Sequence, residues 1–212
     1  MQHIHYKNAY PGMTMFVVGS GKTMDYITPQ FFADKFVIGI NYSAVGLPMA
    51  KGFHVSNHHD DAEKIAEMSP RRFVWTSEIE QVPETDTTNV TITRSNVILA
   101  PTTDQKYGAF DPENDWVEDK LILGPSSATL AMSLAYYMGA DNIVLCGVDC
   151  GMIDGAGRFD GYEVPNGQLQ FQAWQKALDD MAAALRRRGV GVYSLNPWTS
   201  LALEGHSFNG AR

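Results

Sequence analysis

The chain has 212 residues, of which 44% are hydrophobic and 19% are charged, and its formal net charge is −8. These values are typical of a globular protein with one hydrophobic core, and they exclude a disordered, collagen-like or membrane-embedded chain. The basic residues are scattered, apart from Arg186, Arg187 and Arg188. Because no cationic stripe is present for a nucleic acid backbone or an anionic membrane, we expect neither as a main partner.

The first residues, MQHIHYKNAYPGM, contain neither the basic segment nor the apolar segment of an export signal. This pattern predicts a cytoplasmic protein. The chain has two cysteines, Cys146 and Cys150. In a reducing compartment we interpret them as two buried thiols rather than as a disulfide or a metal site.

Short apolar runs alternate with polar turns and helical segments in the first third of the chain. The first predicted strand, at residues 13–18 (MTMFVV), ends in a glycine-rich turn that a helical stretch follows. Further strands are predicted at 36–41, 52–56 and 72–76, with a helix at 60–68 before the last of them. These strands are apolar along most of their length, which is typical of a sheet that is covered on both faces.

The second half has a clearer pattern. Ser126 and Ser127 precede a run that is apolar on most of its helical circumference, which predicts a mostly buried helix. A strand at 142–148 follows, and a glycine-rich loop leads to a long amphipathic helix that ends at 186–188. A last strand is predicted at 191–195. The alternation indicates an α/β fold with a Rossmann-like, mostly parallel sheet and helices on both faces.

Residues 79–122 do not follow this alternation. They contain a threonine-rich, β-prone stretch and then a polar, turn-rich segment. We interpret them as a small middle insertion or lid beside a single domain that spans residues 1–212. An insertion at this place can close over a ligand.

Ligands of open α/β sheets bind at the carboxyl ends of the strands, so polar residues that follow the predicted strands are candidates for a site. The first of these sets is the glycine turn (residues 19–23, GSGKT), which looks like a phosphate-binding loop but has Phe16 where that loop needs a further glycine. Its backbone N–H groups, at the start of a helix, favour an anionic ligand. The alternative is a tight turn that only requires glycine.

A cluster of histidine and carboxylate side chains follows the third predicted strand and comprises His54, His58, His59 and Asp60. It has too few ligands at metal-binding spacing, so we expect no structural metal, and a solvated loop is the simple alternative. One of these histidines, with His58 as the first choice, is a candidate general base because an imidazole titrates near neutral pH.

The segment GPSSATLAMSLAYYMGADNIVLCGVDCG, with the long helix and VYSLNPWTSLA after it, resembles the glycosyltransferase-like superfamily of the motility accessory factor flagellin glycosyltransferases. That superfamily also contains bacterial CMP-sialic acid sialyltransferases, an archaeal 6-hydroxymethylpterin pyrophosphokinase and phage proteins. Near the N-terminus, VVGSGKTMDYI and VIGIN match its first two strands and their turns.

The resemblance implies a Rossmann-like domain with a donor nucleotide, favoured to be of the CMP type, across the carboxyl ends of the strands. It further implies one role for each of seven residues. Gly19, Ser20 and Gly21 would contact phosphate or ribose, and Asn41 would hold the nucleotide. Ser126 and Ser127 would contact the base or the donor, and Asp149 would lie at the ribose side.

The catalytic base departs from the pattern of this superfamily. Its sialyltransferases carry a catalytic histidine in the loop before the long helix, whereas this chain has no histidine between His59 and His206. We therefore expect Asp160 to be the base and Tyr162 to contact the phosphate, since both lie in that loop. His58 is the other candidate for the base.

Together with these patterns, the resemblance implies a nucleotide-binding transferase of the glycosyltransferase-like type that uses a CMP-activated sugar and has no tightly bound cofactor. Two alternatives stay open. One is a pyrophosphokinase-like enzyme that requires Mg²⁺, and the other is a non-catalytic module that binds a nucleotide or a small anion. The expected partner is a nucleotide or nucleotide sugar, and self-association into a homo-oligomer also stays open.

Overall fold

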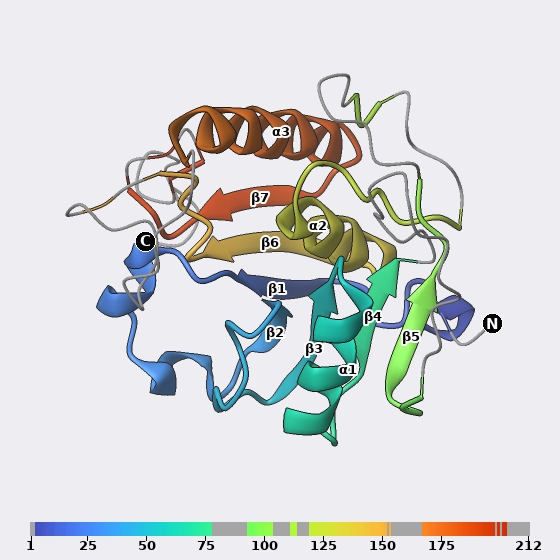
Figure 1. Cartoon of the computed structure of the whole chain (residues 1–212). Helices are drawn as coiled ribbons and strands as arrows, with labels where there is room; N and C mark the ends of the chain where they lie inside the picture. The colour runs from blue at the N-terminus through green and yellow to red at the C-terminus, as the bar shows by residue number, and fades with distance from the viewer. Residues whose placement is uncertain are drawn as a thin grey trace, which may run out of the picture.

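The computed structural model describes residues 3–77, 93–103, 111–113, 119–151, 153, 167–197, 199 and 201–202. Seven strands in these residues form one sheet in the order β5-β4-β3-β2-β1-β6-β7, and every neighbouring pair is parallel (Figure 1). The strands are β1 (Met13–Val18), β2 (Phe36–Ile40), β3 (Lys51–Ser56), β4 (Val74–Ser77), β5 (Val97–Ala100), β6 (Ala140–Cys146) and β7 (Gly191–Ser194).

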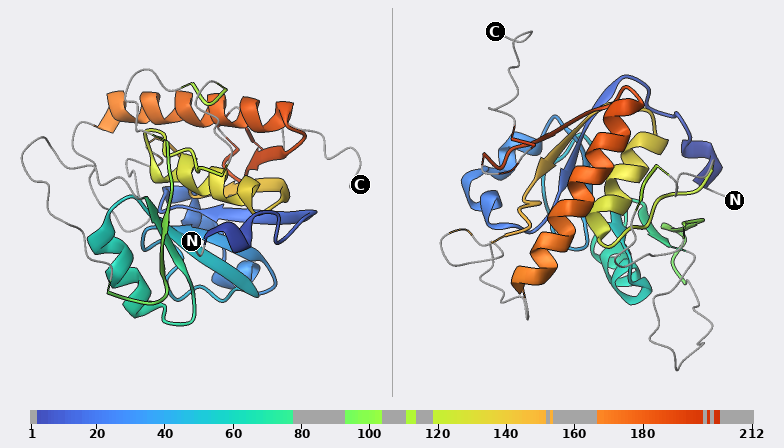
Figure 2. Two further views of the ribbon diagram at one scale, coloured as in Figure 1. Left: turned by 90° about the vertical axis from the view of Figure 1, so that its right-hand side faces the viewer. Right: turned by 90° about the horizontal axis from the view of Figure 1, so that it is seen from above.

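The helices cover both faces of this sheet. The three α-helices are α1 (His59–Met68), α2 (Ser127–Tyr137) and α3 (Gly167–Arg187). Figure 2 shows α2 and α3 on one side of the sheet and α1 on the other. The predicted fold class, α/β with a Rossmann-like parallel sheet, is therefore confirmed. None of the helices in the described part of the chain has the length and hydrophobicity that crossing a bilayer requires.

Helix α2 is apolar on most sides because it packs on four strands and on α3. Its residues from Ala128 to Ala135 are all buried. The apolar residues among them belong to the largest hydrophobic cluster, which also contains Trp75 of β4 and Leu185 of α3. A helix that is enclosed in this way needs no polar face.

The helical stretch predicted after β1 is not one continuous α-helix. It consists of two short 3₁₀ helices, η2 (Lys22–Tyr26) and η3 (Pro29–Phe32), like η1 (His3–Tyr6) before β1. Thr28 between them has an extended backbone with φ −68° and ψ 139°. Proline disfavours a helical conformation for the residue before it and has no N–H to donate, so Pro29 prevents one continuous α-helix.

Part of the predicted insertion belongs to the sheet and its core. Strand β5 pairs in parallel with β4, and Leu121, Ile122 and Leu123 are buried in the largest hydrophobic cluster. The sequence marked this stretch as β-prone but did not assign it to the sheet, because its pairing with β4 is a contact between separate segments that no local pattern shows. The segments 78–92, 104–110 and 114–118 lie outside the described residues, and a lid there stays a prediction.

The order of the strands defines a switch point. The chain builds β1 to β5 outward on one side of β1, and then returns to place β6 on the other side of β1. In open α/β sheets, ligands bind outside the carboxyl ends of the strands where the order reverses in this way. We call the sheet edge formed by these strand ends the carboxyl edge, and the opposite edge the amino edge.

Candidate functional site

The glycine turn after β1 lies directly against the turn after β6. The N–H of Gly19 donates to the carbonyl of Cys146 at 2.8 Å, and the N–H of Gly21 donates to the carbonyl of Gly147 at 2.6 Å. A Cβ atom on Gly19 would lie 2.5 Å from the Gly147 oxygen, so only glycine permits this approach. These two N–H groups of the turn are therefore already hydrogen-bonded within the protein, one to the last residue of β6 and one to the turn after it.

Asp149 lies beside this turn and is 7% exposed. One carboxylate oxygen, Oδ2, accepts the N–H of Thr23 at 2.8 Å. The other, Oδ1, accepts the hydroxyl of Thr23 at 2.5 Å and the side-chain amide of Asn196 at 3.1 Å. The structure thus brings Asp149 and the glycine turn together, and the carboxylate is already bonded to groups of the protein.

Asn41 follows β2, the neighbour of β1. Its backbone is left-handed with φ 51°, a conformation that asparagine accepts more readily than most residues. Its N–H donates to the carbonyl of Val55 at 2.8 Å, and the hydroxyl of nearby Ser43 donates to the carbonyl of Val18 at 2.5 Å. The side-chain oxygen of Asn41 is buried and has no hydrogen-bond partner within the described chain. A buried acceptor of this kind indicates that a ligand or a water completes the site.

Ser126 and Ser127 lie at the start of α2, which runs back across the sheet toward the beginning of β6. Ser126 has the extended backbone of an N-cap residue, but its hydroxyl makes no capping hydrogen bond. The Ser126 oxygen is buried, and no partner for it exists in the described part of the chain. Ser127 is half-buried. A second unpartnered polar atom therefore lies where the helix begins, above the central strands that α2 packs on.

The three clustered histidines have different environments. His58 is exposed at the N-cap position of α1, whereas His59 is buried, with its Nε2 2.6 Å from the carbonyl of Ser77. His54 is buried inside β3, where burial and the positive charge of Arg72 lower its pKa to about 4. Among the described residues, no group of three or more His, Cys, Asp and Glu side chains can hold a metal ion. The other predicted catalytic residues, Asp160 and Tyr162, lie outside the described residues.

The two cysteines are free thiols. Cys146 is buried, and Cys150 is half-buried. Burial raises the pKa of both, to about 12 for Cys150, where the negative charges of Asp149 and Asp179 contribute. Such thiols are protonated at neutral pH and are poor nucleophiles.

Thr23 and Asn196 follow predicted strands, and Thr23 belongs to the glycine turn, but the sequence assigned neither of them a role. Both donate to Asp149 from other segments of the chain. Asn196 follows β7, so the rule that polar residues after strands are candidates also applies to it. The partner of Thr23 could not be recognised, because it lies 126 positions away in the chain.

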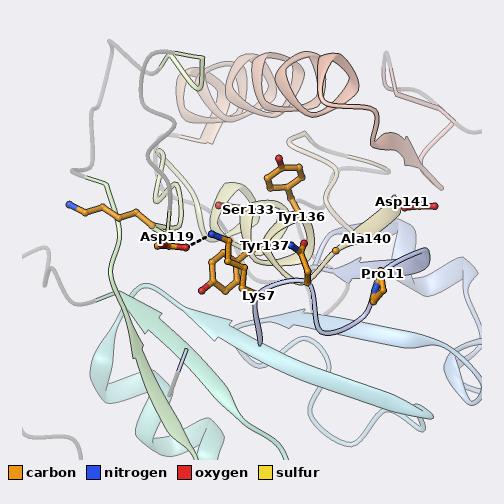
Figure 3. A pocket seen from close by; sticks show the side chains of 11 residues that line it. Lys7, Pro11, Asp119, Ser133, Tyr136, Tyr137, Ala140 and Asp141 are labelled. Atoms are coloured by element: carbon orange, nitrogen blue, oxygen red, sulfur yellow. Dashed lines mark hydrogen bonds and ion pairs between the residues drawn. The ribbon is translucent and has the colours of Figure 1, made fainter. Parts of the chain in front are cut away.

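A cavity of about 510 Å³ lies at the amino edge, beside the end of α2 and the beginning of β6 (Figure 3). Its lining residues include Lys7 and Asn8 before β1, Tyr136 at the end of α2, and Asp141 in β6. Lys7 forms an ion pair with Asp119 at 2.5 Å. None of the site residues predicted from the sequence lines this cavity.

Comparison with known proteins gives a likeness of fold. No protein-family model and no curated protein sequence matches the chain. The structure of the MAf glycosyltransferase from Magnetospirillum magneticum AMB-1 matches at 15% identity with a TM-score of 0.58, over 96% of this chain and 37% of that protein. The chain therefore spans just over a third of the length of that glycosyltransferase.

A second match is the sialyltransferase CstII from Campylobacter jejuni in complex with the substrate analogue CMP-3FNeuAc. It has 14% identity and a TM-score of 0.48, over 89% of this chain and 83% of that enzyme. A structure of CstII in complex with CMP gives the same values. The match to the MAf glycosyltransferase confirms the predicted resemblance at the level of the fold, which the chain shares with the matching part of that protein.

Proposed function

We propose that this chain is a nucleotide-binding transferase of the glycosyltransferase type, with a CMP-activated sugar as its donor. One observation carries the proposal: Asn41 and Ser126 each place at or above the carboxyl edge a buried oxygen that has no partner among the described residues, and this edge contains the switch point where sheets of this class bind ligands. The fold shared with the MAf glycosyltransferase supports the class of reaction. The choice of CMP rests on the sequence motifs.

In this proposal the donor nucleotide lies across the carboxyl ends of β1, β2 and β6. Asn41 and Ser126 contact it through their unpartnered oxygens, and the half-buried Ser20 and Ser127 contribute further hydroxyls. Neutral donors and acceptors of this kind fix the orientation of a ligand in a pocket. Asp149 lies on the ribose side, beneath the glycine turn.

The transfer step needs a base within hydrogen-bond reach of the acceptor hydroxyl. The base takes the hydroxyl proton, the acceptor oxygen bonds to the anomeric carbon of the sugar, and the bond from that carbon to the phosphate oxygen breaks and releases CMP. Position in the chain favours Asp160 as this base, and Tyr162 as a hydroxyl that contacts the leaving phosphate. His58 is the alternative, since it is exposed at the start of α1, close after the end of β3.

Binding and turnover together test the proposal. We expect CMP to raise the melting temperature of the purified chain more than UDP, GDP, ATP or NAD does, because a ligand at about 100 times its Kd stabilises the folded state by roughly 2.7 kcal/mol. We also expect release of CMP from a CMP-activated sugar. Binding of CMP without any release would identify a non-catalytic module, and Mg²⁺-dependent consumption of ATP would favour the pyrophosphokinase alternative. Absence of binding by every nucleotide would refute the proposal.

A further inference from the structure

The phosphate-loop-like sequence of the glycine turn has a different use in this protein. We infer that Asp149 is a positioning residue: its carboxylate is an internal anion that occupies the donor groups of the turn, so that the turn binds the protein's own carboxylate and not the phosphate of a ligand. The part of this inference that concerns CMP affinity rests on the proposed function. The part that concerns the turn itself does not.

The hydrogen bonds of Asp149 carry the inference. Three donors converge on the carboxylate, and they come from two segments that lie 126 and 47 residues away in the chain. Thr23 supplies its N–H and its hydroxyl, and Asn196 supplies its amide. Both oxygens of the carboxylate are used, and the residue is 7% exposed. Hydrogen bonds to a charged carboxylate are strong, so several of them together hold the Asp149 side chain in one position.

The turn is shaped to fit the carboxylate. A Cβ atom on Gly21 would lie 2.5 Å from the Oδ2 atom of Asp149, so the absence of a side chain at Gly21 leaves the room that the carboxylate fills. On the other side, a Cβ atom on Gly147 would lie 2.4 Å from the Cγ atom of Met24. The two turns are therefore packed against each other with Asp149 at their junction.

Several other groups of the glycine turn are also engaged within the protein. The ammonium group of Lys22 forms an ion pair with Asp25, three residues later. The N–H groups of Gly19 and Gly21 donate to carbonyls at the end of β6 and in the turn after it. The motif therefore resembles a phosphate-binding loop in sequence, but its lysine, its threonine and two of its amides have partners in the chain itself.

Loss of the carboxylate leaves three donors without their acceptor, which loosens the turn from the ends of β6 and β7. If Asp149 acts only by holding the turn, a small carboxylate in solution can replace it. Formate has the charge and the two oxygens of the missing group, and truncation of the side chain to alanine leaves space for it.

Hydrogen exchange of the Thr23 amide tests this without any nucleotide. We expect this amide to exchange at least about ten-fold faster in Asp149→Ala than in the wild type, as the loss of a charged hydrogen bond implies. Formate restores slow exchange in the variant, and chloride at equal ionic strength does not. Exchange that is unchanged in Asp149→Ala, or that formate fails to slow, would overturn the inference.

Two variants of Thr23 complete the test and remain useful if Asp149→Ala does not fold. Thr23→Val removes the hydroxyl at nearly constant shape, and Thr23→Ser keeps it. We expect CMP affinity to fall about ten-fold in Thr23→Val, since one hydrogen bond to a charged group is lost, and to return in Thr23→Ser.

The ligand measurements separate the two roles of Asp149. Equal CMP affinity in wild type and Thr23→Val, with loss in Asp149→Ala, would mean that the carboxylate touches the nucleotide, and would overturn the inference. If the wild type binds no nucleotide while the Thr23 amide behaves as expected, the proposed function fails and the positioning role stands.

Discussion

The two edges of the sheet both collect polar residues, but they differ in how those residues are satisfied. At the amino edge, the N–H groups of Asn8, Tyr10 and Gly12 donate to the carbonyls that end α2 and precede β6, and Lys7 forms an ion pair with Asp119. At the carboxyl edge, Asn41 has a buried oxygen with no partner among the described residues. At the amino edge, N–H groups of the chain satisfy the carbonyls at the end of α2. At the carboxyl edge, buried acceptors have no partner among the described residues.

The cavity and the proposed site therefore lie at different edges of the sheet. The cavity of about 510 Å³ lies at the amino edge, where segment 8–12 closes the helix end. The carboxyl edge has polar atoms whose burial is unfavourable until something bonds to them. We therefore assign the ligand to the carboxyl edge and a structural role to the amino edge.

The largest expected effect concerns two histidines with contrasting burial, His54 in β3 and the exposed His5 in η1. The pKa of His54 falls from 6.5 to about 4 on folding, mainly through burial. Between pH 6.5 and about 4 the unfolded chain therefore binds more protons than the folded protein. The contribution of His54 to the free energy of unfolding is fully present above pH 6.5 and is lost as the pH falls toward about 4. The full shift corresponds to about 3 kcal/mol.

Chemical denaturation at several pH values measures this effect. The variant His54→Leu should lose much less stability than the wild type between pH 6.5 and 4. The control His5→Leu keeps the buried imidazole and should show the wild-type loss. Parallel curves for His54→Leu and wild type would show that His54 is not responsible.

A large effect on turnover is expected at Asp160, which tests whether the carboxyl edge is catalytic. Asp160→Asn should lower the rate of sugar transfer about 10²-fold, the usual contribution of a general base, and should leave CMP affinity nearly unchanged. Comparison with His58→Ala under the same conditions locates the base. Full activity in Asp160→Asn with loss in His58→Ala would assign the role to the histidine.

A smaller effect is expected at Asn41, for which the amino edge offers a matched control. Asn41 and Asn8 are both left-handed asparagines, with φ 51° and 52°, so glycine replaces either side chain without backbone strain. Asn41→Gly should weaken CMP binding about ten-fold, the value of one hydrogen bond to a buried acceptor. Asn8→Gly should bind CMP like the wild type in the same calorimetric titration. Equal affinities for both variants would remove Asn41 from the site.

The smallest effect is expected from the ion pair at the amino edge. The side chains of Lys7 and Asp119 are 36% and 56% exposed, and pairs of this kind contribute at most about 1 kcal/mol. Lys7→Met should therefore change the free energy of unfolding by less than this and leave CMP affinity unchanged. Loss of CMP binding in Lys7→Met would contradict the assignment of the ligand to the carboxyl edge.

The sequence predicted those elements whose signal is local. The apolar runs of β1, β2 and β6 and the helical spacing of α3 are visible in short windows, because side-chain periodicity follows directly from backbone geometry. Polar residues after these strands pointed to Asn41 and Asp149, since parallel strands bring their carboxyl ends to one edge. The two 3₁₀ helices were missed because a single proline, Pro29, outweighed the helical pattern around it.

What the sequence alone determined is the class of fold, the order of its strong elements, and the edge at which polar residues gather. The tertiary structure decided which of those residues remain available. Asp149 is hydrogen-bonded to Thr23 and Asn196, whereas the side-chain oxygen of Asn41 has no partner in the part of the chain that the structure describes, although both residues follow buried strands. The physical reason is that a hydrogen bond depends on distances of about 3 Å between atoms, and residues far apart in the chain reach such distances only when the whole sheet is assembled.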